Sequence, residues 1–194
     1  MSKAEQTRAY IVEKTAPIFN KKGYEGTSLA DMTKATGLTK GSIYGNFANK
    51  DEVALASFDY NLAKIENIIC SEMNKYQTAR DKLLVYVNVY DSFLKHPFPE
   101  GGCPILNTAT DCDDTHAGLK KKANQAIHNW KNRIVHLIEK GMEKKEFKKT
   151  FDAESTALTI IAAIEGAIMI TKLTGKINYR NAIMKNVKQI IENL

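Results

Sequence analysis

The sequence has little of what disulfide-linked or membrane-spanning proteins need. Its three cysteines in 194 residues are an odd and sparse set, which excludes a disulfide framework. No run of eighteen apolar residues occurs, and the most apolar stretch, residues 157–170, is interrupted by Thr159, Glu165 and Gly166. A transmembrane span is therefore not expected. The first fourteen residues also lack the apolar core of a secretory signal, so we expect a cytoplasmic protein.

The motifs of common enzymes are missing as well. The sequence has no phosphate-cradling glycine loop, no nucleophile elbow and no HExxH pair, and its four histidines are scattered. Cys112, Asp113, Asp114 and His116 carry metal-compatible atoms but lack zinc-site spacing, so we expect the two aspartates to cap the following helix instead. On one helix Cys103 and Cys112 would lie about 13 Å apart, beyond disulfide reach. We therefore predict no enzyme activity, no metal and no cofactor.

What the sequence does have is a moderately basic charge balance and helical periodicity. The net charge is +6, and residues 1–50 supply +4 of it with eight cations and four acids. Strand-like alternation is nearly absent, whereas apolar residues recur at helical spacing throughout. We predict an all-α fold of about nine helices, with a helix-turn-helix DNA-binding domain over residues 1–48 and an effector-binding and dimerisation domain over residues 49–194. The expected helices span about residues 3–22, 28–37, 39–47, 49–75, 78–95, 103–112, 115–141, 152–173 and 178–194.

Residues 27–47 follow the plan of a helix-turn-helix motif. Thr27 or Ser28 can cap the first short helix, and Gly37 permits the tight turn after it. Leu29, Met32, Leu38 and Ile43 are expected to face the core. The exposed start of the second short helix is small and polar, which lets it approach DNA phosphates and base edges; it consists of Thr39, Lys40, Gly41 and Ser42.

The same region matches a known pattern in order and spacing. The matching residues are Phe19-x3-Gly23-Tyr24-x2-Thr27-Ser28, followed by Gly37-Leu38-Thr39-Lys40-Gly41-Ser42-Ile43-Tyr44-x2-Phe47-x2-Lys50. Over these fifty residues the chain resembles the tetracycline-repressor (TetR) family of transcriptional regulators. The later run from Gly101 to Asn107, followed by Asp113 and Asp114, resembles one TetR subgroup.

The resemblance implies a homodimer in which the first three helices bind palindromic double-stranded operator DNA. It further implies that helices four to seven enclose an effector pocket and that the last two helices form a four-helix bundle with their mates. Two departures are Thr33, where the family usually has alanine, and Gly45, where a larger residue is common. The residues that the resemblance assigns to DNA contact are Thr27, Ser28, Thr39, Lys40, Gly41, Ser42, Tyr44 and Lys50.

Two further sets of residues combine this resemblance with residue chemistry. A small, mostly apolar effector is expected among side chains on the inward faces of the middle helices: Leu84, Val87, Asn88, Phe93, Cys103, Asn107, Trp130 and Met169. Trp130 also fits a plain core position. The last two helices combine small and branched apolar side chains suited to close helix pairing, and the expected dimer interface contains Leu158, Ile161, Ala162, Gly166, Ile183, Val187 and Ile190.

The prediction from the sequence is a TetR-type transcriptional regulator, and more specifically a repressor that a small effector releases from its operator. The alternative is a helical small-molecule carrier or sequestering protein in which residues 1–50 are a structural cap. The basic, small-residue recognition surface favours the regulator.

Overall fold

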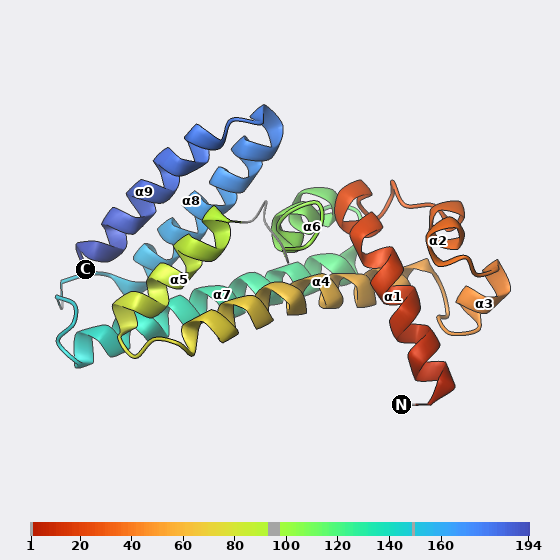
Figure 1. The fold of residues 1–194 in the computed structure, drawn as a ribbon, viewed down its shortest axis with the longest axis horizontal. Helices are drawn as coiled ribbons and strands as arrows, with labels where there is room; N and C mark the ends of the chain where they lie inside the picture. The colour runs from red at the N-terminus through yellow and green to blue at the C-terminus, as the bar shows by residue number, and fades with distance from the viewer. Residues whose placement is uncertain (1, 93–97, 149) are drawn as a thin grey trace. The chain divides into compact units, whose positions relative to one another are not determined.

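The computed structural model describes all residues except Met1, 93–97 and 149, and the part that it describes contains nine α-helices and no strand. This confirms the predicted all-α fold. The chain forms two compact units (Figure 1). Unit 1 consists of Met1–Ile65 with Pro97–Gln125, and unit 2 consists of Glu66–His96 with Ala126–Leu194. The helices α4 (Lys50–Met73) and α7 (Ala117–Glu143) contribute residues to both.

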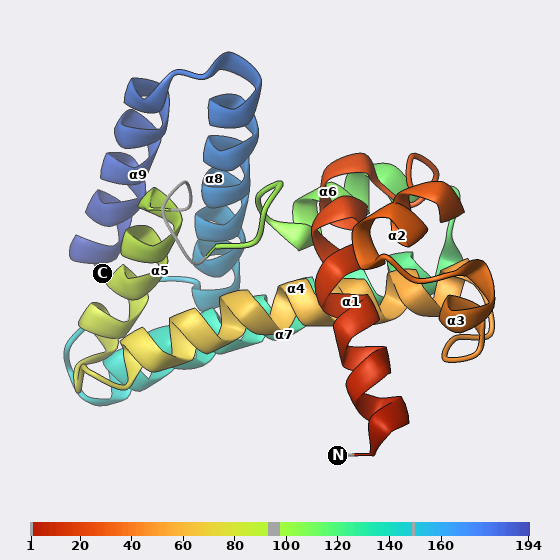
Figure 2. The same ribbon diagram turned by 45° about the vertical axis from the view of Figure 1, so that its right-hand side comes forward.

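Unit 1 contains α1 (Lys3–Lys22), α2 (Leu29–Thr36), α3 (Lys40–Tyr44) and α6 (Pro104–Cys112), with the first parts of α4 and α7. A capping box of Ser2 and Glu5 begins α1. Figure 2 shows α2 and α3 beside α1. The core of this unit is formed by inward side chains of these helices, among them Ile11, Ala16, Met32, Ile43, Phe47 and Val53.

Unit 2 contains α5 (Ala79–Asp91), α8 (Ala153–Thr174) and α9 (Ile177–Glu192), with the remainders of α4 and α7. Figures 1 and 2 both show α8 and α9 side by side, with α5 against them. Arg80 joins these elements, because its guanidinium donates to the carbonyl oxygens of Ile191 at 2.9 Å and of Glu146 at 3.0 Å. It also donates at 2.6 Å to the carbonyl oxygen of Glu192, the last residue of α9, and this oxygen has no partner within the helix.

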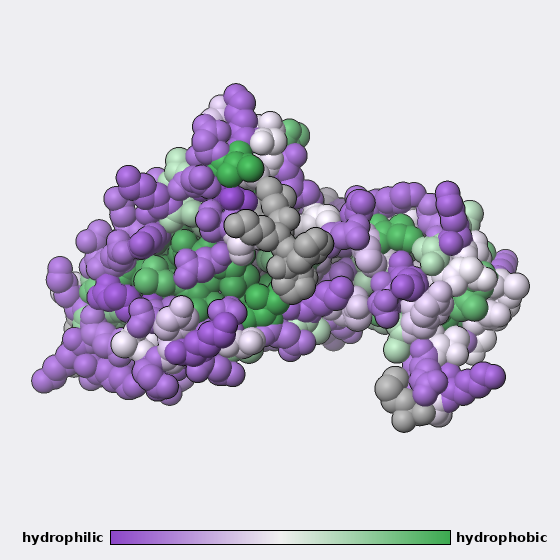
Figure 3. Space-filling model, viewed as in Figure 1, coloured by the Kyte–Doolittle hydropathy of each residue, from purple (hydrophilic) through white to green (hydrophobic). Residues whose placement is uncertain are grey.

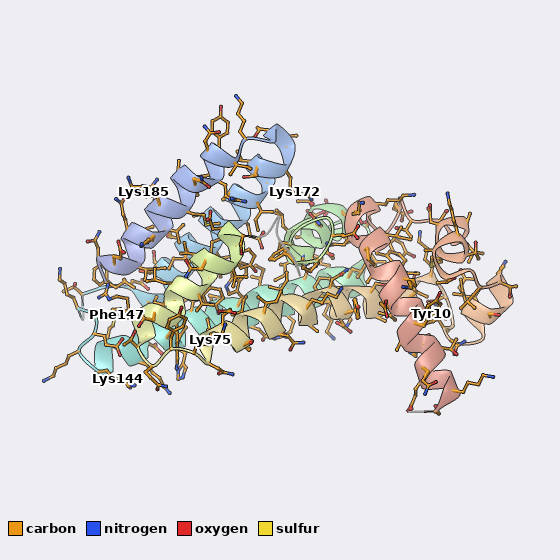
Figure 4. All side chains as sticks on the ribbon, viewed as in Figure 1. Tyr10, Lys75, Lys144, Phe147, Lys172 and Lys185 are labelled. Carbon is orange, nitrogen blue, oxygen red and sulfur yellow. The ribbon has the colours of Figure 1, made fainter. Side chains whose placement is uncertain are left out.

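The ends of α8 and α9 differ in how they are formed. Asp152 caps α8 by accepting from the backbone N–H of Ser155, and Gly175 ends it in the left-handed conformation, as expected. The last helix begins at Ile177 rather than at Asn178 and has no side-chain cap. Lys172 on α8 and Lys185 on α9 point outward (Figure 4). Among the described helices, α8 is long and apolar enough to cross a membrane, but the core helix of a soluble protein has the same character.

Two other expected helix boundaries are corrected. The third helix ends at Tyr44, three residues before Phe47, because the chain turns at Gly45 while Phe47 enters the core. His116, not Asp113 or Asp114, caps α7: its Nδ1 accepts the backbone N–H of Leu119 at 3.1 Å, and both aspartates are exposed. The predicted end of the fifth helix, up to residue 95, falls partly outside the described residues.

Candidate nucleic-acid interface

The helix-turn-helix is built by local hydrogen bonds that the sequence largely predicts. Ser28 caps α2 by accepting from the backbone N–H of Asp31 at 3.1 Å, while Asp31 accepts from the backbone of Ser28 in return. Gly37 ends α2 with φ +68°, a conformation that favours glycine. Thr39 then caps α3 through a bond of 3.2 Å from the N–H of Ser42. The two short helices are thereby fixed on either side of the turn.

The buried and exposed faces of this motif separate cleanly. Met32 and Ile43 are fully buried and Phe47 nearly so, whereas Leu29 and Leu38 are half-buried. The exposed side of α3 presents Thr39, Lys40, Gly41 and Ser42, as predicted. A Cβ at Gly41 would approach nothing nearer than the Thr39 hydroxyl at 3.9 Å, so the backbone there is open to an approaching surface.

Thr27 does not belong to this exposed face. Its side chain is fully buried and its hydroxyl donates to the carbonyl oxygen of Gly23 at 2.7 Å. The threonine therefore fixes the turn between α1 and α2, and the capping role falls to Ser28 alone. Tyr44 is half-buried, and Gly45 is exposed.

Lys50 is held in place by the residues around Tyr24. Its ammonium lies 4.3 Å from the centre of the Tyr24 ring, a cation–π arrangement. The Tyr24 hydroxyl donates to the carboxylate of Asp51, and this hydrogen bond, with a smaller effect of burial, raises the pKa of Tyr24 to about 12. The edge of the His116 ring packs against Tyr24 with centroids 4.5 Å apart. The start of α4 is therefore positioned by α1 and by the start of α7.

Arg8 is a supporting residue that sequence reasoning missed. Its guanidinium donates to the carbonyl oxygen of Asn46 at 2.5 Å and to Glu52 at 2.6 Å, and it lies 3.9 Å from the centre of the Phe47 ring. One arginine thus ties α1 to the connection between α3 and α4. No local signal marks this role, because the partners lie 38 to 44 residues away in the chain.

The motif at residues 101–107 also has a structural role. It leads into α6, which packs on the end of α1. The backbone N–H of Tyr24 donates to Asp111 at 2.6 Å, and a Cβ at Gly23 would lie 2.4 Å from that carboxylate. Gly101 has φ +93°, and a Cβ there would lie 2.9 Å from the carbonyl oxygen of Asn20. Glycine is therefore required at both positions for α1 and α6 to approach this closely.

The predicted effector residues divide between the two units. Cys103 is buried and Asn107 half-buried in unit 1, while Val87 and Trp130 are buried in unit 2. Leu84 is half-buried and Asn88 exposed; Phe93 lies outside the described residues. Met169 is 51% exposed, contrary to the expectation that it faces the interior of the chain. Met169 directly follows the fully buried Ile168, and the turn of about 100° per residue carries it to the exposed side of α8.

The predicted dimer residues divide by burial. Ile161 and Val187 are buried in the packing of α8 against α9 within one chain, and Ile183 and Ile190 are half-buried. Leu158 is 47% exposed, Ala162 is exposed, and a Cβ at Gly166 would have open space within 4 Å. These three, with Met169 and Leu173, recur at helical spacing on the outer face of α8.

Within the described part of the chain, no group of three or more His, Cys, Asp or Glu residues is arranged to hold a metal ion. All three cysteines are free; Cys70 is exposed, and Cys103 and Cys112 are buried. Burial and the neighbouring carboxylate of Asp111 raise the pKa of Cys112 to about 12. This thiol is therefore protonated and unreactive at neutral pH.

The fold and the exposed start of α3 define a helix-turn-helix DNA-binding protein with a helical second domain. Comparison with known proteins gives the family. Residues 11–56 match the profile described as bacterial regulatory proteins, tetR family, and residues 79–187 match that of the tetracyclin repressor-like C-terminal domain. The chain belongs to the TetR family, and it is a DNA-binding transcriptional regulator rather than an enzyme.

Individual relatives agree with this assignment. A TetR-family regulator from Cytophaga hutchinsonii is 43% identical, with 100% of this chain and 97% of that one covered and a TM-score of 0.94. A TetR regulator from Chloroflexus aurantiacus is 34% identical over 99% and 97% of the two chains, with the same TM-score. The HTH-type transcriptional regulator TtgR of Pseudomonas putida is 24% identical over 85% of this chain and 80% of its own.

Proposed function

We propose that this protein is a cytoplasmic repressor that binds a palindromic operator as a homodimer and leaves it when a small, mostly apolar effector binds. The observation that carries the proposal is the exposed start of α3, where Thr39, Lys40, Gly41 and Ser42 face outward on a support of buried side chains. Such a surface suits entry into the major groove. A relative of 24% identity, IcaR of Staphylococcus aureus, is named a negative transcriptional regulator.

The outer face of α8 supports the dimer. Met169 and Leu173 are 51% and 83% exposed, and Ile177 at the start of α9 is 49% exposed. Exposed apolar side chains gathered on neighbouring helices mark an interaction surface, and a twofold pair is the commonest assembly. Two recognition helices in such a pair would lie about 34–36 Å apart, or a multiple of that distance, to match successive major grooves.

Effector release requires a difference in the effector's affinity for two conformations of the protein. The effector must bind the conformation that does not bind DNA more tightly than it binds the DNA-binding conformation. A tenfold loss of operator affinity needs about 1.4 kcal/mol of coupling free energy. The candidate effector residues in unit 2 are Leu84, Val87, Asn88 and Trp130, on α5 and α7.

Fluorescence anisotropy with DNA from upstream of the protein's own gene tests the proposal. Wild type should bind one palindromic site in preference to scrambled DNA, and Lys40→Ala and Thr39→Ala should change the preference among related sites. Lys34→Ala is the control, because Lys34 is exposed at the end of α2 and not on the predicted DNA face. If no upstream DNA is preferred while small apolar molecules still bind, the protein is a carrier and not a repressor.

A further inference from the structure

Three aromatic rings on two helices form a cluster inside unit 2. Trp130 on α7 stacks on Tyr90 of α5, with centroids 5.3 Å apart and ring planes 14° apart. Tyr86, one turn earlier on α5, has its ring centroid 6.0 Å from Trp130. The exposed fractions are 1% for Tyr86, 2% for Tyr90 and 7% for Trp130. All three side chains are therefore removed from water.

Two polar atoms of this cluster carry a proton for which the described part of the chain supplies no acceptor. They are the hydroxyl of Tyr86 and the indole Nε1 of Trp130. A buried polar group without a partner destabilises the folded protein, and such groups are rare in native structures. The two unused donors therefore indicate an acceptor that arrives from outside the chain.

The chemistry of the two groups defines that partner. An indole N–H can only donate. Burial raises the pKa of the Tyr86 hydroxyl above its ordinary value, so the hydroxyl keeps its proton, although the guanidinium of Arg133, which donates a hydrogen bond to the hydroxyl oxygen, opposes the shift. Since a guanidinium can also only donate, it leaves the tyrosine proton available. Two donors on adjacent rings select a ligand that brings an acceptor.

The surrounding charges favour a neutral acceptor. Arg133 is already paired with Glu66, with 3.7 Å between guanidinium nitrogen and carboxylate oxygen, so the cation close to Tyr86 is compensated. The neighbouring residues of α5 include the buried apolar side chains of Leu83 and Val87, and Figure 3 shows hydrophobic atoms over α5. A carbonyl oxygen gains two hydrogen bonds here, whereas a carboxylate would lose most of its hydration.

We propose that Trp130 and Tyr86 form the polar end of a binding site for a planar aromatic molecule that carries a neutral carbonyl oxygen. The indole N–H and the phenol O–H donate to this oxygen, and the ligand's ring packs among the side chains of α5 and α7. Only the statement that this molecule is the effector rests on the proposed function. The site itself is defined by the two unsatisfied donors.

The first test is stability without ligand. Tyr86→Phe keeps the ring and removes a buried donor that has no acceptor, together with the bond from Arg133, so its urea midpoint should stay close to that of wild type. Tyr90→Phe is the matched control in the same stack, because the Tyr90 hydroxyl is not among the unsatisfied atoms; it should give an equal or lower midpoint than Tyr86→Phe. A midpoint for Tyr86→Phe clearly below both wild type and the control would show that the hydroxyl is already satisfied and would overturn the proposal.

The second test is equilibrium dialysis with two probes of nearly equal shape, 2-acetonaphthone and 2-ethylnaphthalene. Wild type should bind the ketone at least about tenfold more tightly than the hydrocarbon, as expected for two hydrogen bonds to one oxygen. Tyr86→Phe and Trp130→Phe should each remove most of this preference, while Tyr90→Phe keeps it. Equal binding of the two probes by wild type, or no binding of either up to its solubility, would refute the site.

No DNA is present in the dialysis, so the two proposals fail separately. A ketone that binds with the expected preference but leaves operator binding unchanged supports the site and contradicts effector release by this ligand class. If the ketone releases the operator but is bound no more tightly than the hydrocarbon, effector release is supported and the proposed site is overturned.

Discussion

The side-chain amide of Asn107 in α6 donates to the backbone oxygen of Asn20 at 2.9 Å and to its side-chain oxygen at 3.2 Å. A third acceptor is the carbonyl oxygen of Gly101 at 2.9 Å. The amide of Asn20 in turn donates to the carbonyl oxygen of Gly102 at 3.0 Å. Two asparagines 87 residues apart thus close the end of α1 against the segment that begins α6. The space beside them, about 20 Å³, has room for one water molecule.

We expect Asn107→Ala to lower the free energy of unfolding by about 1–3 kcal/mol, because it leaves half-buried acceptors without a donor. Urea unfolding followed by circular dichroism measures the effect. Thr110→Ala is the control on the same helix, since its exposed hydroxyl bonds only to carbonyl oxygens of α6 itself. Equal stability of the two variants would show that the bonds between the asparagines add nothing to the fold.

Lys50→Ala should weaken binding to all DNA sequences alike and reduce the slope of log affinity against log salt by about one. The matched control is Lys64→Ala in the same helix. Lys64 also lies over a tyrosine ring, that of Tyr60 at 4.8 Å, but it is three to four turns farther along α4. A salt series in anisotropy distinguishes the two. If Lys50→Ala keeps the wild-type slope, Lys50 contacts no phosphate.

The folded state should lose stability as the medium becomes acidic, in part through Glu52. The backbone N–H of Ala48 and the guanidinium of Arg8 both donate to this carboxylate and lower its pKa below the ordinary value near 4.5. A lowered pKa in the folded state stabilises the protein above the unfolded pKa, and this contribution disappears as the pH falls through the folded value.

Glu52→Gln should therefore be less stable than wild type at neutral pH and should show a smaller further loss on acidification. Thermal unfolding between pH 7 and pH 3 checks this. Glu72→Gln, which changes a surface carboxylate at the end of α4 that is paired with Lys75 just beyond the helix, serves as the control. Parallel curves for wild type and Glu52→Gln would contradict the assignment.

One of the three thiols should react with Ellman's reagent in the native protein, and all three after unfolding. Cys70 is exposed, whereas Cys103 and Cys112 are buried and the pKa of Cys112 is raised to about 12. Thiolates are the reactive form. Cys70→Ser should abolish the native reaction, and a second thiol that reacts at the rate of Cys70 would show that one of the buried cysteines is accessible.

Gly166→Trp should separate the subunits without unfolding the chain. A Cβ at this position has no atom within 4 Å in the single chain, so we expect the substitution to leave the isolated fold intact. Sedimentation should show a monomer for Gly166→Trp, a dimer for wild type, and a dimer for the control Lys120→Trp at an exposed site on α7. Operator binding should be lost with dimerisation. A wild type that sediments as a monomer at micromolar concentration would remove the basis of the proposed dimer.

The sequence predicts the helices well where the signals are local. Ser28, Thr39 and Asp152 cap the helices that they were expected to cap, and Gly37 and Gly175 end theirs in the left-handed conformation. Each of these signals acts over three or four residues, and the local hydrogen bonds decide the outcome without help from distant parts of the chain.

The parts that could not be predicted depend on distant partners. Arg8 bonds to Asn46 and Glu52, and Asn107 bonds to Asn20, and none of these pairs has a spacing that a helix would reveal. Thr27 was expected to cap α2 because threonine is a common N-cap residue. Its hydroxyl instead donates to the carbonyl oxygen of Gly23. Periodicity placed Met169 on an inward face, although its turn of α8 faces outward.

The outer face of α3 takes almost no part in holding the protein together. Lys40, Gly41 and Ser42 are exposed, and a side chain at Gly41 would meet open surroundings. Substitutions at such positions usually change stability by no more than about 0.5 kcal/mol. Ile43 and Phe47, by contrast, are fixed by their burial. The operator that this protein recognises can therefore diverge during evolution through single substitutions that leave the fold intact, so close relatives with the same architecture can read different DNA.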